Sequence, residues 1–335
     1  MDAATRDRLF GYQHAFDHPV TLGISIAVIA VLVVAYAAIY LLHAAKRTDA
    51  KLHDELLKRV RSWAVMAPLL IAPVLLGAAW TIAGVALLSV LCYREYARAT
   101  GLFRFRAISA VVVFGLACLT FAIADHWYGF FAAIPPLTVV LIAMVAILKD
   151  EPKGYIQRVG LGAIGFLLFG VCFGHLGYMA NDADFRPIVL LILVTVELND
   201  VFAYISGKTL GRRKLVPNTS PNKTIGGAVG ALVLTTTLVA VLGHFVFAGT
   251  RVDGVLTLVG LGLIVSVAGQ FGDLMLSSIK RDIGIKDMGA TIPGHGGLLD
   301  RFDSLILVAP AVFHYVAYLR GFGTDQVPRI MSGGG

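Results

Sequence analysis

Long apolar runs separated by short polar segments are the main pattern of this sequence. The first run extends from about residue 20 to 42, long enough for a helix that crosses a bilayer. The run from 63 to 95 is too long for one crossing, and Gly77 lies near its middle, so it predicts two helices joined by a tight turn. Further runs cover about 107–124, 127–148, 157–179, 187–206, 224–247, 254–276 and 304–320. Together they predict an all-α, polytopic membrane protein with about ten transmembrane helices.

Two polar segments near the start of the chain lie outside these runs. Residues 1–18 are polar, and no short apolar run with a small-residue cleavage site follows, so we expect no signal peptide. Residues 44–61 are basic and amphipathic, which predicts a helix that lies along the cytoplasmic surface.

The composition excludes a soluble globular domain. Hydrophobic residues make up 57% of the 335 positions and charged residues 15%, and the mean hydropathy is +0.79. The net charge is +7, but the basic residues lie between apolar runs, so we expect them to face anionic lipid and not nucleic acid. Three distant cysteines indicate neither a disulfide framework nor a metal site.

The distribution of basic residues predicts the orientation in the membrane. All but six of the 28 Lys and Arg residues fall in alternate connections between the predicted spans. The positive-inside rule places these connections in the cytoplasm and both termini outside. The exceptions are Arg6, Arg8, Arg186, Arg251, Arg320 and Arg329.

Charge is concentrated between Phe271 and Ser304. If the segment that enters this stretch is helical, Asp273, Ser277 and Lys280 share one face. Glycines and Pro293 predict an irregular turn, after which a new helix begins near Asp300. The stretch also holds Arg281, Lys286, Asp287, His295, Arg301, Asp303 and Ser304.

Aspartates and basic residues in this arrangement are typical of phosphate chemistry. Two carboxylates within 4 Å repel by about 4 kcal/mol at an effective dielectric near 20, so their convergence needs cations. Mg²⁺ prefers such hard oxygen ligands together with substrate phosphates, and lysines would hold the phosphate oxygens. The stretch therefore predicts phosphoryl or nucleotidyl transfer on the cytoplasmic side. The alternative is a cytoplasmic loop whose opposite charges pair in solvent.

A second polar cluster lies near the end of the 187–206 run. Glu197, Asp200, Tyr204 and Lys208 form one stripe of a helix, with Asn199 adjacent. Acidic residues within a span usually face a polar cavity, although a structural pair between Asp200 and Lys208 or a loop arginine is the alternative.

Glycines, hydroxyls and basic residues follow this stripe and lead into the next helix. This composition predicts an anion-binding loop, and a patch for lipid headgroups is the alternative. The spacing is not that of a P-loop. The loop includes Lys208, Arg212, Arg213, Lys214, Ser220, Lys223 and Thr224.

The two clusters together resemble the phosphatidate cytidylyltransferase family, the CDP-diacylglycerol synthases. The second half of the resemblance lies in Ser277, Ile279, Lys280, Arg281, Lys286, Asp287, Gly289, Ile292, Pro293, His295, Gly296, Gly297, Leu298, Asp300, Arg301, Phe302 and Asp303. The first half lies in Asn199, Ala203, Tyr204, Gly207, Lys208, Ser220, Pro221, Lys223, Thr224 and Gly227. The chain departs from the family pattern at Asn222, Gly226 and Leu276, where a lysine and two glutamates are more typical.

The resemblance implies a transfer of the cytidylyl group from CTP to phosphatidate, which yields CDP-diacylglycerol and pyrophosphate. It implies Mg²⁺, with a second metal ion of open identity as a further option, and Asp273, Asp300 and Asp303 as metal ligands. The catalytic set would be Asp273, Lys280, Asp287, Asp300 and Asp303. The substrate-binding set would be Asn199, Asp200, Lys208, Ser220, Lys223, Thr224, Ser277, Arg281, Lys286, His295 and Arg301.

Three other functions stay open: transfer to another lipid phosphate, a CTP-dependent lipid kinase, and a lipid-phosphate binding or transport protein without catalysis. The expected partners are CTP, phosphatidate or a related lipid phosphate, and membrane lipids, with a homodimer open as the assembly. No transit peptide is visible, so we expect a multi-pass protein of the bacterial inner membrane.

Charge is confined to loops before about residue 180 and enters the spans afterwards. This shift suggests a division into an extra N-terminal span with its basic connection (1–61), N-terminal membrane helices (62–180), a catalytic membrane region (181–321) and a flexible tail (322–335).

Overall fold

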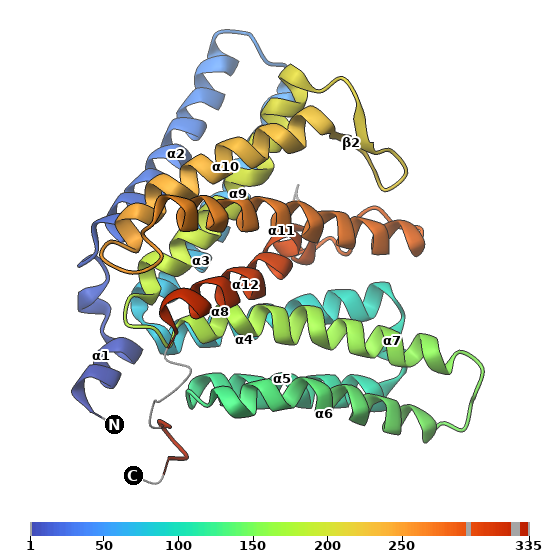
Figure 1. Ribbon diagram of the computed structural model, residues 1–335. Coiled ribbons are helices and arrows are strands. Elements are labelled where there is room, and N and C mark those ends of the chain that lie inside the picture. Colours follow the sequence, from blue (N-terminus) through green and yellow to red (C-terminus); the bar gives the residue numbers. More distant parts are fainter. Residues whose placement is uncertain (1, 293–295, 323–328, 334–335) are drawn as a thin grey trace.

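The computed structural model describes residues 2–292, 296–322 and 329–333. Most of this part of the chain is helical (Figure 1). The helices are α1 (Ala3–Phe10), α2 (Pro19–Ala44), α3 (Ala50–Leu76), α4 (Ala78–Ala99), α5 (Arg106–Ala124), α6 (Tyr128–Ile147), α7 (Tyr155–Gly165), α8 (Phe173–Met179), α9 (Phe185–Leu210), α10 (Ile225–Val246), α11 (Val255–Asp282) and α12 (Leu299–Arg320).

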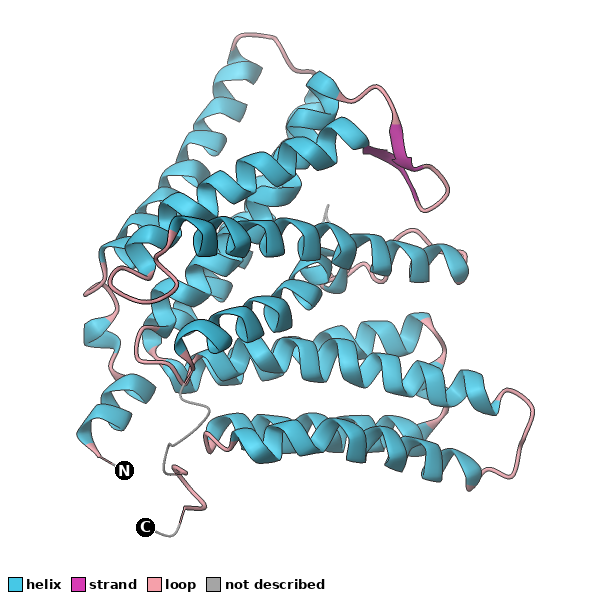
Figure 2. Cartoon of the chain, in the orientation of Figure 1, coloured by secondary structure: helices cyan, strands magenta, loops and turns pink. Residues whose placement is uncertain are grey.

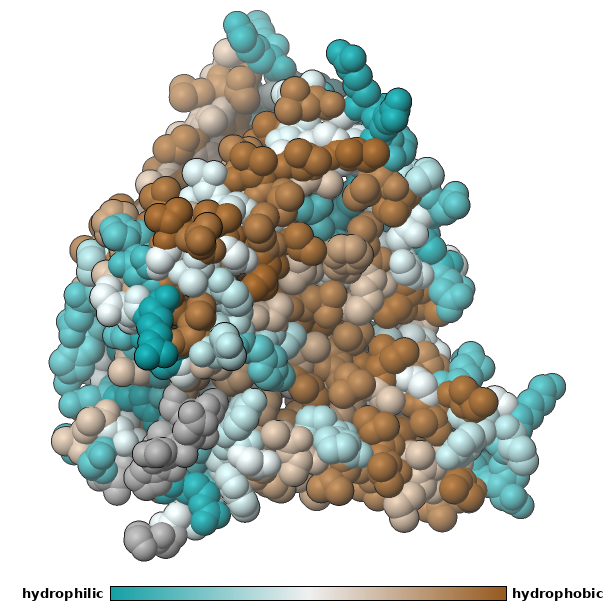
Figure 3. Space-filling view, in the orientation of Figure 1, coloured by the Kyte–Doolittle hydropathy of each residue, from teal (hydrophilic) through white to brown (hydrophobic). Residues whose placement is uncertain are grey.

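Ten helical segments in the described part of the chain are long and apolar enough to cross a membrane, so the predicted all-α, polytopic architecture is confirmed. One of these segments is continuous from α7 to α8 through a π-helical stretch, Phe166–Cys172. Large apolar side chains cover much of the outer surface, and hydrophilic residues gather mainly at its rims (Figure 3).

The turn between α3 and α4 lies at Gly77, as the sequence predicts. Its φ angle is +135°, in a region that L side chains rarely adopt. A Cβ atom at this position would lie 2.4 Å from the carbonyl oxygen of Leu9 at the end of α1. The glycine therefore permits both the turn and the close packing of α1 against it.

The prediction of a separate surface helix over 44–61 was wrong. Residues 50–61 are the first turns of α3, which continues to Leu76 without interruption, so the domain boundary suggested after residue 61 falls inside a helix. Asp49 caps the start of α3, because its side chain accepts a hydrogen bond from the amide of Leu52 at 2.7 Å. The amphipathic pattern arises because one side of these turns packs in the bundle, where Leu57 is buried.

The C-terminal half forms a compact group of helices. α10 packs between α9 and α11, and α12 lies against α11 and α8 (Figure 1). Between α9 and α10 the chain forms a hairpin of two antiparallel strands, β1 (Lys214–Val216) and β2 (Ser220–Thr224), which projects from the helices (Figure 2). The sequence predicted only a loop here. Pro217 and Asn218 supply the turn between the strands.

Candidate active site

Carboxylates from three helices converge in this C-terminal group: Asp200 of α9, Asp273 of α11 and Asp303 of α12. The Asp303 carboxylate is 6% exposed and is repelled by the other two. Asp200 is accessible to solvent and accepts a hydrogen bond from the hydroxyl of Ser304 at 3.3 Å. The hydroxyl of Ser277 donates to Asp273 at 3.1 Å. The helical face predicted from Asp273 to Lys280 is thus confirmed, and Asp200, from the second polar cluster, joins the aspartates of the stretch between Phe271 and Ser304.

A close helix crossing brings these residues together. A Cβ atom at Gly272 would lie 2.5 Å from the carbonyl oxygen of Asp303, so the backbones of α11 and α12 touch at this point. Small residues permit such approach between helices in membranes. The glycine immediately before Asp273 therefore sets the distance between two of the three carboxylates.

Lys223 supplies a cation to this group from outside the helices. It lies on strand β2, and its Nζ atom is 2.5 Å from Oδ2 of Asp273. The two side chains are 21% and 22% exposed, so the pair lies near the surface of the site. Arg281 holds the same hairpin, because its Nε donates to the carbonyl oxygen of Thr219 at 3.3 Å. The hairpin thus covers the carboxylates from one side.

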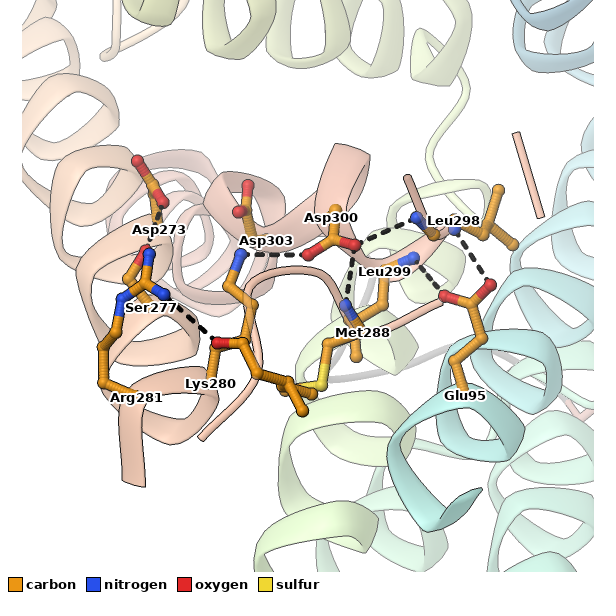
Figure 4. A network of polar contacts seen from close by, with 12 residues as sticks. Glu95, Asp273, Ser277, Lys280, Arg281, Met288, Leu298, Leu299, Asp300 and Asp303 are labelled. Atoms are coloured by element: carbon orange, nitrogen blue, oxygen red, sulfur yellow. Dashed lines mark hydrogen bonds and ion pairs between the residues drawn. The ribbon is translucent and has the colours of Figure 1, made fainter. Parts of the chain in front are cut away.

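Asp300 accepts hydrogen bonds from three other residues (Figure 4). Its Oδ1 accepts from Lys280 Nζ at 2.9 Å, and its Oδ2 accepts from the amides of Met288 and Gly297, each at 2.9 Å. The side chains of Asp300 and Lys280 are 3% and 10% exposed. The sequence predicted Asp300 as a metal ligand and Lys280 as a catalytic residue. Oδ2 therefore holds the loop that precedes α12, and Oδ1 pairs with Lys280 of α11. The metal-ligand role of Asp300 stays a prediction.

Glu95, at the end of α4, is a residue that the sequence reasoning missed. Its carboxylate accepts from the amides of Leu298 and Leu299 at 3.0 and 2.8 Å and from the hydroxyl of Thr291 at 2.5 Å (Figure 4). It therefore caps the N-terminus of α12, where a negative charge is favourable. The signal that could have found it is that α4 contains no other acidic residue.

We expect Glu95→Ala to loosen the loop before α12. Loss of a side chain that caps a helix N-terminus costs about 0.5–2 kcal/mol. The expected result is a lower thermal midpoint in detergent and faster amide exchange at residues 288–299. Glu55→Ala is the matched control, because Glu55 pairs with Arg59 on an exposed helix surface. Equal exchange in the two variants would contradict this role for Glu95.

Three residues predicted to bind substrate make contacts within the protein, and their roles in binding stay predictions. The carbonyl oxygen of Asn199, a side chain that is fully buried, accepts from Thr235 at 2.9 Å and from Ser266 at 2.7 Å, so it ties α9 to α10 and α11. Thr224 caps α10 by accepting from the amide of Gly227 at 3.1 Å. Lys208 extends over the ring of Tyr204, 5.5 Å from its centroid.

The remaining predicted residues lie at the edge of the site or beyond the described part. Lys286 and Asp287 are exposed, and no described contact joins them to the three carboxylates. Ser220 is partly buried on β2. His295 lies outside the described residues. Of the unusual positions, Leu276 is fully buried, and a Cβ atom at Gly226 would already lie 2.7 Å from the carbonyl oxygen of Leu210.

Arg301 balances part of the negative charge. It interacts electrostatically with Glu197 and Asp200, one turn apart on α9. Its Nε atom is buried and has no hydrogen-bond partner among the described residues. A buried guanidinium donor without a partner is costly, so an anionic ligand would satisfy it.

The donor set suits a divalent cation that also binds a ligand. Among the described residues, no three His, Cys, Asp or Glu side chains are grouped so that all three could hold a metal ion. Mg²⁺ commonly takes only one or two carboxylates and completes its shell with phosphates and water. One or two of Asp200, Asp273 and Asp303 would meet that requirement, and the ammonium of Lys223 provides positive charge beside Asp273.

Comparison with known proteins agrees with this geometry. Residues 57–319 match the model of the cytidylyltransferase family. An uncharacterized Escherichia coli protein, YnbB, is 31% identical over 79% of this chain and 88% of its own length. The phosphatidate cytidylyltransferase of Bacillus subtilis is 32% identical over 64% of this chain and 81% of its own length. That of Staphylococcus haemolyticus is 38% identical over 51% of this chain and 65% of its own length.

The family match covers α4 to α11 entirely, together with most of α3 and of α12. It therefore includes all three converging carboxylates, the hairpin with Lys223, and Glu95. The bacterial relatives and the ten apolar helices indicate a multi-pass protein of the inner membrane. The chain thus belongs to the cytidylyltransferase family and is a nucleotidyltransferase of the bacterial inner membrane.

Proposed function

We propose that this enzyme transfers the cytidylyl group of CTP to phosphatidate, forming CDP-diacylglycerol and pyrophosphate. The observation that carries the proposal is the convergence of Asp200, Asp273 and Asp303 beside Lys223 and Arg301 within a membrane-spanning bundle. This combination suits a substrate pair that is rich in phosphate, of which one member is a lipid. The family match and the names of two relatives support the same reaction.

The reaction needs no nucleophile from the protein. An oxygen of the lipid phosphate attacks the α-phosphorus of CTP, the bond from that phosphorus to the bridging oxygen of the β-phosphate breaks, and pyrophosphate leaves with that oxygen. Lys223 and Arg301 would bind phosphate oxygens and stabilise the charge that develops on them. Catalysis would then rest on positioning and on electrostatics.

The metal would be Mg²⁺, held by one or two of the carboxylates of Asp200, Asp273 and Asp303. Bound there, it would supply a Lewis acid that neutralises charge on the nucleotide phosphates. Lys223 forms an ion pair with Asp273. When the nucleotide binds, the same lysine would release the carboxylate and contact a phosphate. Asp300, Lys280 and Glu95 would act indirectly, by fixing the loop that leads into α12.

Labelled CTP separates the proposed reaction from a lipid kinase. A cytidylyltransferase moves a label at the α-phosphate into the lipid product and a label at the γ-phosphate into pyrophosphate. A CTP-dependent kinase would instead move the γ-label into the lipid. We expect only the α-label in the lipid, with phosphatidate as the preferred acceptor. Transfer of the γ-label, or a preference for another lipid phosphate, would overturn the proposal.

Lys223→Met tests the role of the hairpin. Hydrogen bonds to charged groups contribute about 1.5–3 kcal/mol, which corresponds to about a 10- to 100-fold change in affinity. We expect the KM for CTP to rise by that factor, and Lys223→Arg to recover part of the loss. Lys214→Met, on the other strand of the hairpin and exposed, is the control and should leave the KM unchanged. If Lys223→Met and Lys214→Met raise the KM equally, the effect comes from the overall positive charge of the hairpin and not from a contact between Lys223 and CTP.

A further inference from the structure

A cavity of about 810 Å³ lies between α2, α3, α9 and α10, away from the catalytic carboxylates. Its walls include Gly23 and Ala27 of α2, Trp63 of α3 and Leu193 of α9. Among the residues that line it in the described part of the chain, Glu197 alone is charged. The cavity is therefore apolar, with Glu197 as the one charged side chain in its lining.

Glu197 links the cavity to the candidate active site. Glu197 lies one turn before Asp200 on α9, and Cβ atoms at this spacing are about 5–6 Å apart. The two carboxylates repel each other, and both are attracted by Arg301 of α12. A molecule that placed a phosphate near Arg301 could thus extend an apolar chain into the cavity.

The cavity is long enough to hold one acyl chain. The lining residues of α2 run from Pro19 to Ala35, which spans about 24 Å at 1.5 Å per residue. Half of a bilayer's hydrocarbon core is about 15 Å thick, so the cavity is longer than the depth that one layer of acyl chains fills. The volume lies within the range of about 300–1,000 Å³ that is usual for ligand sites. The cavity is partly open to the outside of the helix bundle, so a lipid chain could enter it from the membrane.

We propose that this cavity binds an acyl chain of the lipid-phosphate substrate, with the phosphate held at the end near Glu197 and Arg301. The inference rests on the proposed function and adds a specificity site to it. α2 ends at Ala44, and the family match begins at residue 57, so one wall of the site comes from a helix outside the matched region. This wall would let the enzyme select lipids by the length of their acyl chains.

Gly23→Trp tests the site through activity. A Cβ atom at Gly23 meets nothing within 4 Å, so a large side chain would enter the cavity without displacing the protein. We expect the KM for dioleoyl phosphatidate to rise by about tenfold or more, while the KM for dioctanoyl phosphatidate and both kcat values stay within about twofold. Gly160→Trp on α7, where a Cβ atom also meets nothing within 4 Å, should leave the KM for both lipids unchanged. Equal effects on long and short lipids, or none, would overturn the proposal.

A binding measurement separates failure of the site from failure of the proposed reaction. In a Trp80→Phe/Trp127→Phe background, Trp63 is the only tryptophan and lines the cavity. We expect phosphatidate with brominated acyl chains to quench its fluorescence more strongly than the same mole fraction of brominated phosphatidylcholine. Selective quenching without any CDP-lipid product would support the lipid site and refute the reaction. Equal quenching by both lipids would show bulk lipid in the cavity and overturn the inference.

Discussion

Asp303→Asn is expected to abolish nucleotidyl transfer while leaving the fold at least as stable as before. Asp303 lies within the carboxylate group of Asp200 and Asp273, which repel it. An asparagine keeps the Oδ1 atom that accepts from the amide of Ser304 at 2.8 Å, so the local geometry survives. The substitution removes the repulsion, but it also removes the charge that would hold a metal. Loss of one electrostatic contact to a transition state typically costs about 10²–10³ in rate.

The measurement is the initial rate of CDP-lipid formation, together with the thermal midpoint of the same preparation in detergent. Asp282→Asn, at the exposed end of α11, should change neither quantity. A strong loss of rate with an unchanged or higher midpoint is the expected pair of results. An Asp303→Asn protein that keeps most of its activity would refute the catalytic role, and one with a much lower midpoint would assign Asp303 to stability.

Asp300→Ala is expected to give the opposite pattern, with a large loss of stability. The carboxylate of Asp300 pairs with Lys280 at 2.9 Å, and both side chains are nearly buried. Removing one partner of a buried pair leaves an uncompensated charge, which costs about 3–5 kcal/mol. The amides of Met288 and Gly297 also lose their acceptor. We expect the thermal midpoint to fall sharply and activity to be lost through unfolding of the loop before α12.

A double variant distinguishes stability from catalysis at this pair. In Lys280→Met/Asp300→Ala neither charge is left unpaired, so the protein should be more stable than Lys280→Met alone or Asp300→Ala alone. Thermal unfolding of the wild type, both single variants and the double variant gives the coupling between the two residues. A single Asp300→Ala protein that melts like the wild type, yet makes no product, would show that Asp300 acts in the chemistry itself.

The ten apolar helices could be predicted from the sequence because each run is long and its boundaries coincide with charged residues or glycine. The face shared by Asp273, Ser277 and Lys280 was also predictable, since a regular helix fixes it. The helix over 50–61 was misplaced because an amphipathic pattern does not distinguish a helix on a membrane surface from the end of a spanning helix that packs on one side. The hairpin at Lys223 was missed because its strands are short.

The composition of the site was only partly predictable. Local spacing cannot tell which of several aspartates bind a ligand and which support the fold, because the answer depends on backbone amides that arrive from elsewhere. Asp300 accepts hydrogen bonds from the amides of Met288 and Gly297 in the preceding loop. The spacing of residues in the sequence does not show how this loop folds. Glu95 lies about two hundred residues before α12 and meets it only through the tertiary fold. Asn199 likewise proved to be a buried link between helices.

The most direct test of the central claim is the balance of products. Purified protein in detergent is supplied with CTP, Mg²⁺ and phosphatidate, and CDP-diacylglycerol and pyrophosphate are both quantified, with Asp303→Asn assayed in parallel. We predict equal amounts of the two products from the wild type, none from the variant, and none when EDTA removes the metal. Pyrophosphate without CDP-lipid, or equal product from the wild type and Asp303→Asn, would contradict the assignment of these carboxylates to cytidylyl transfer.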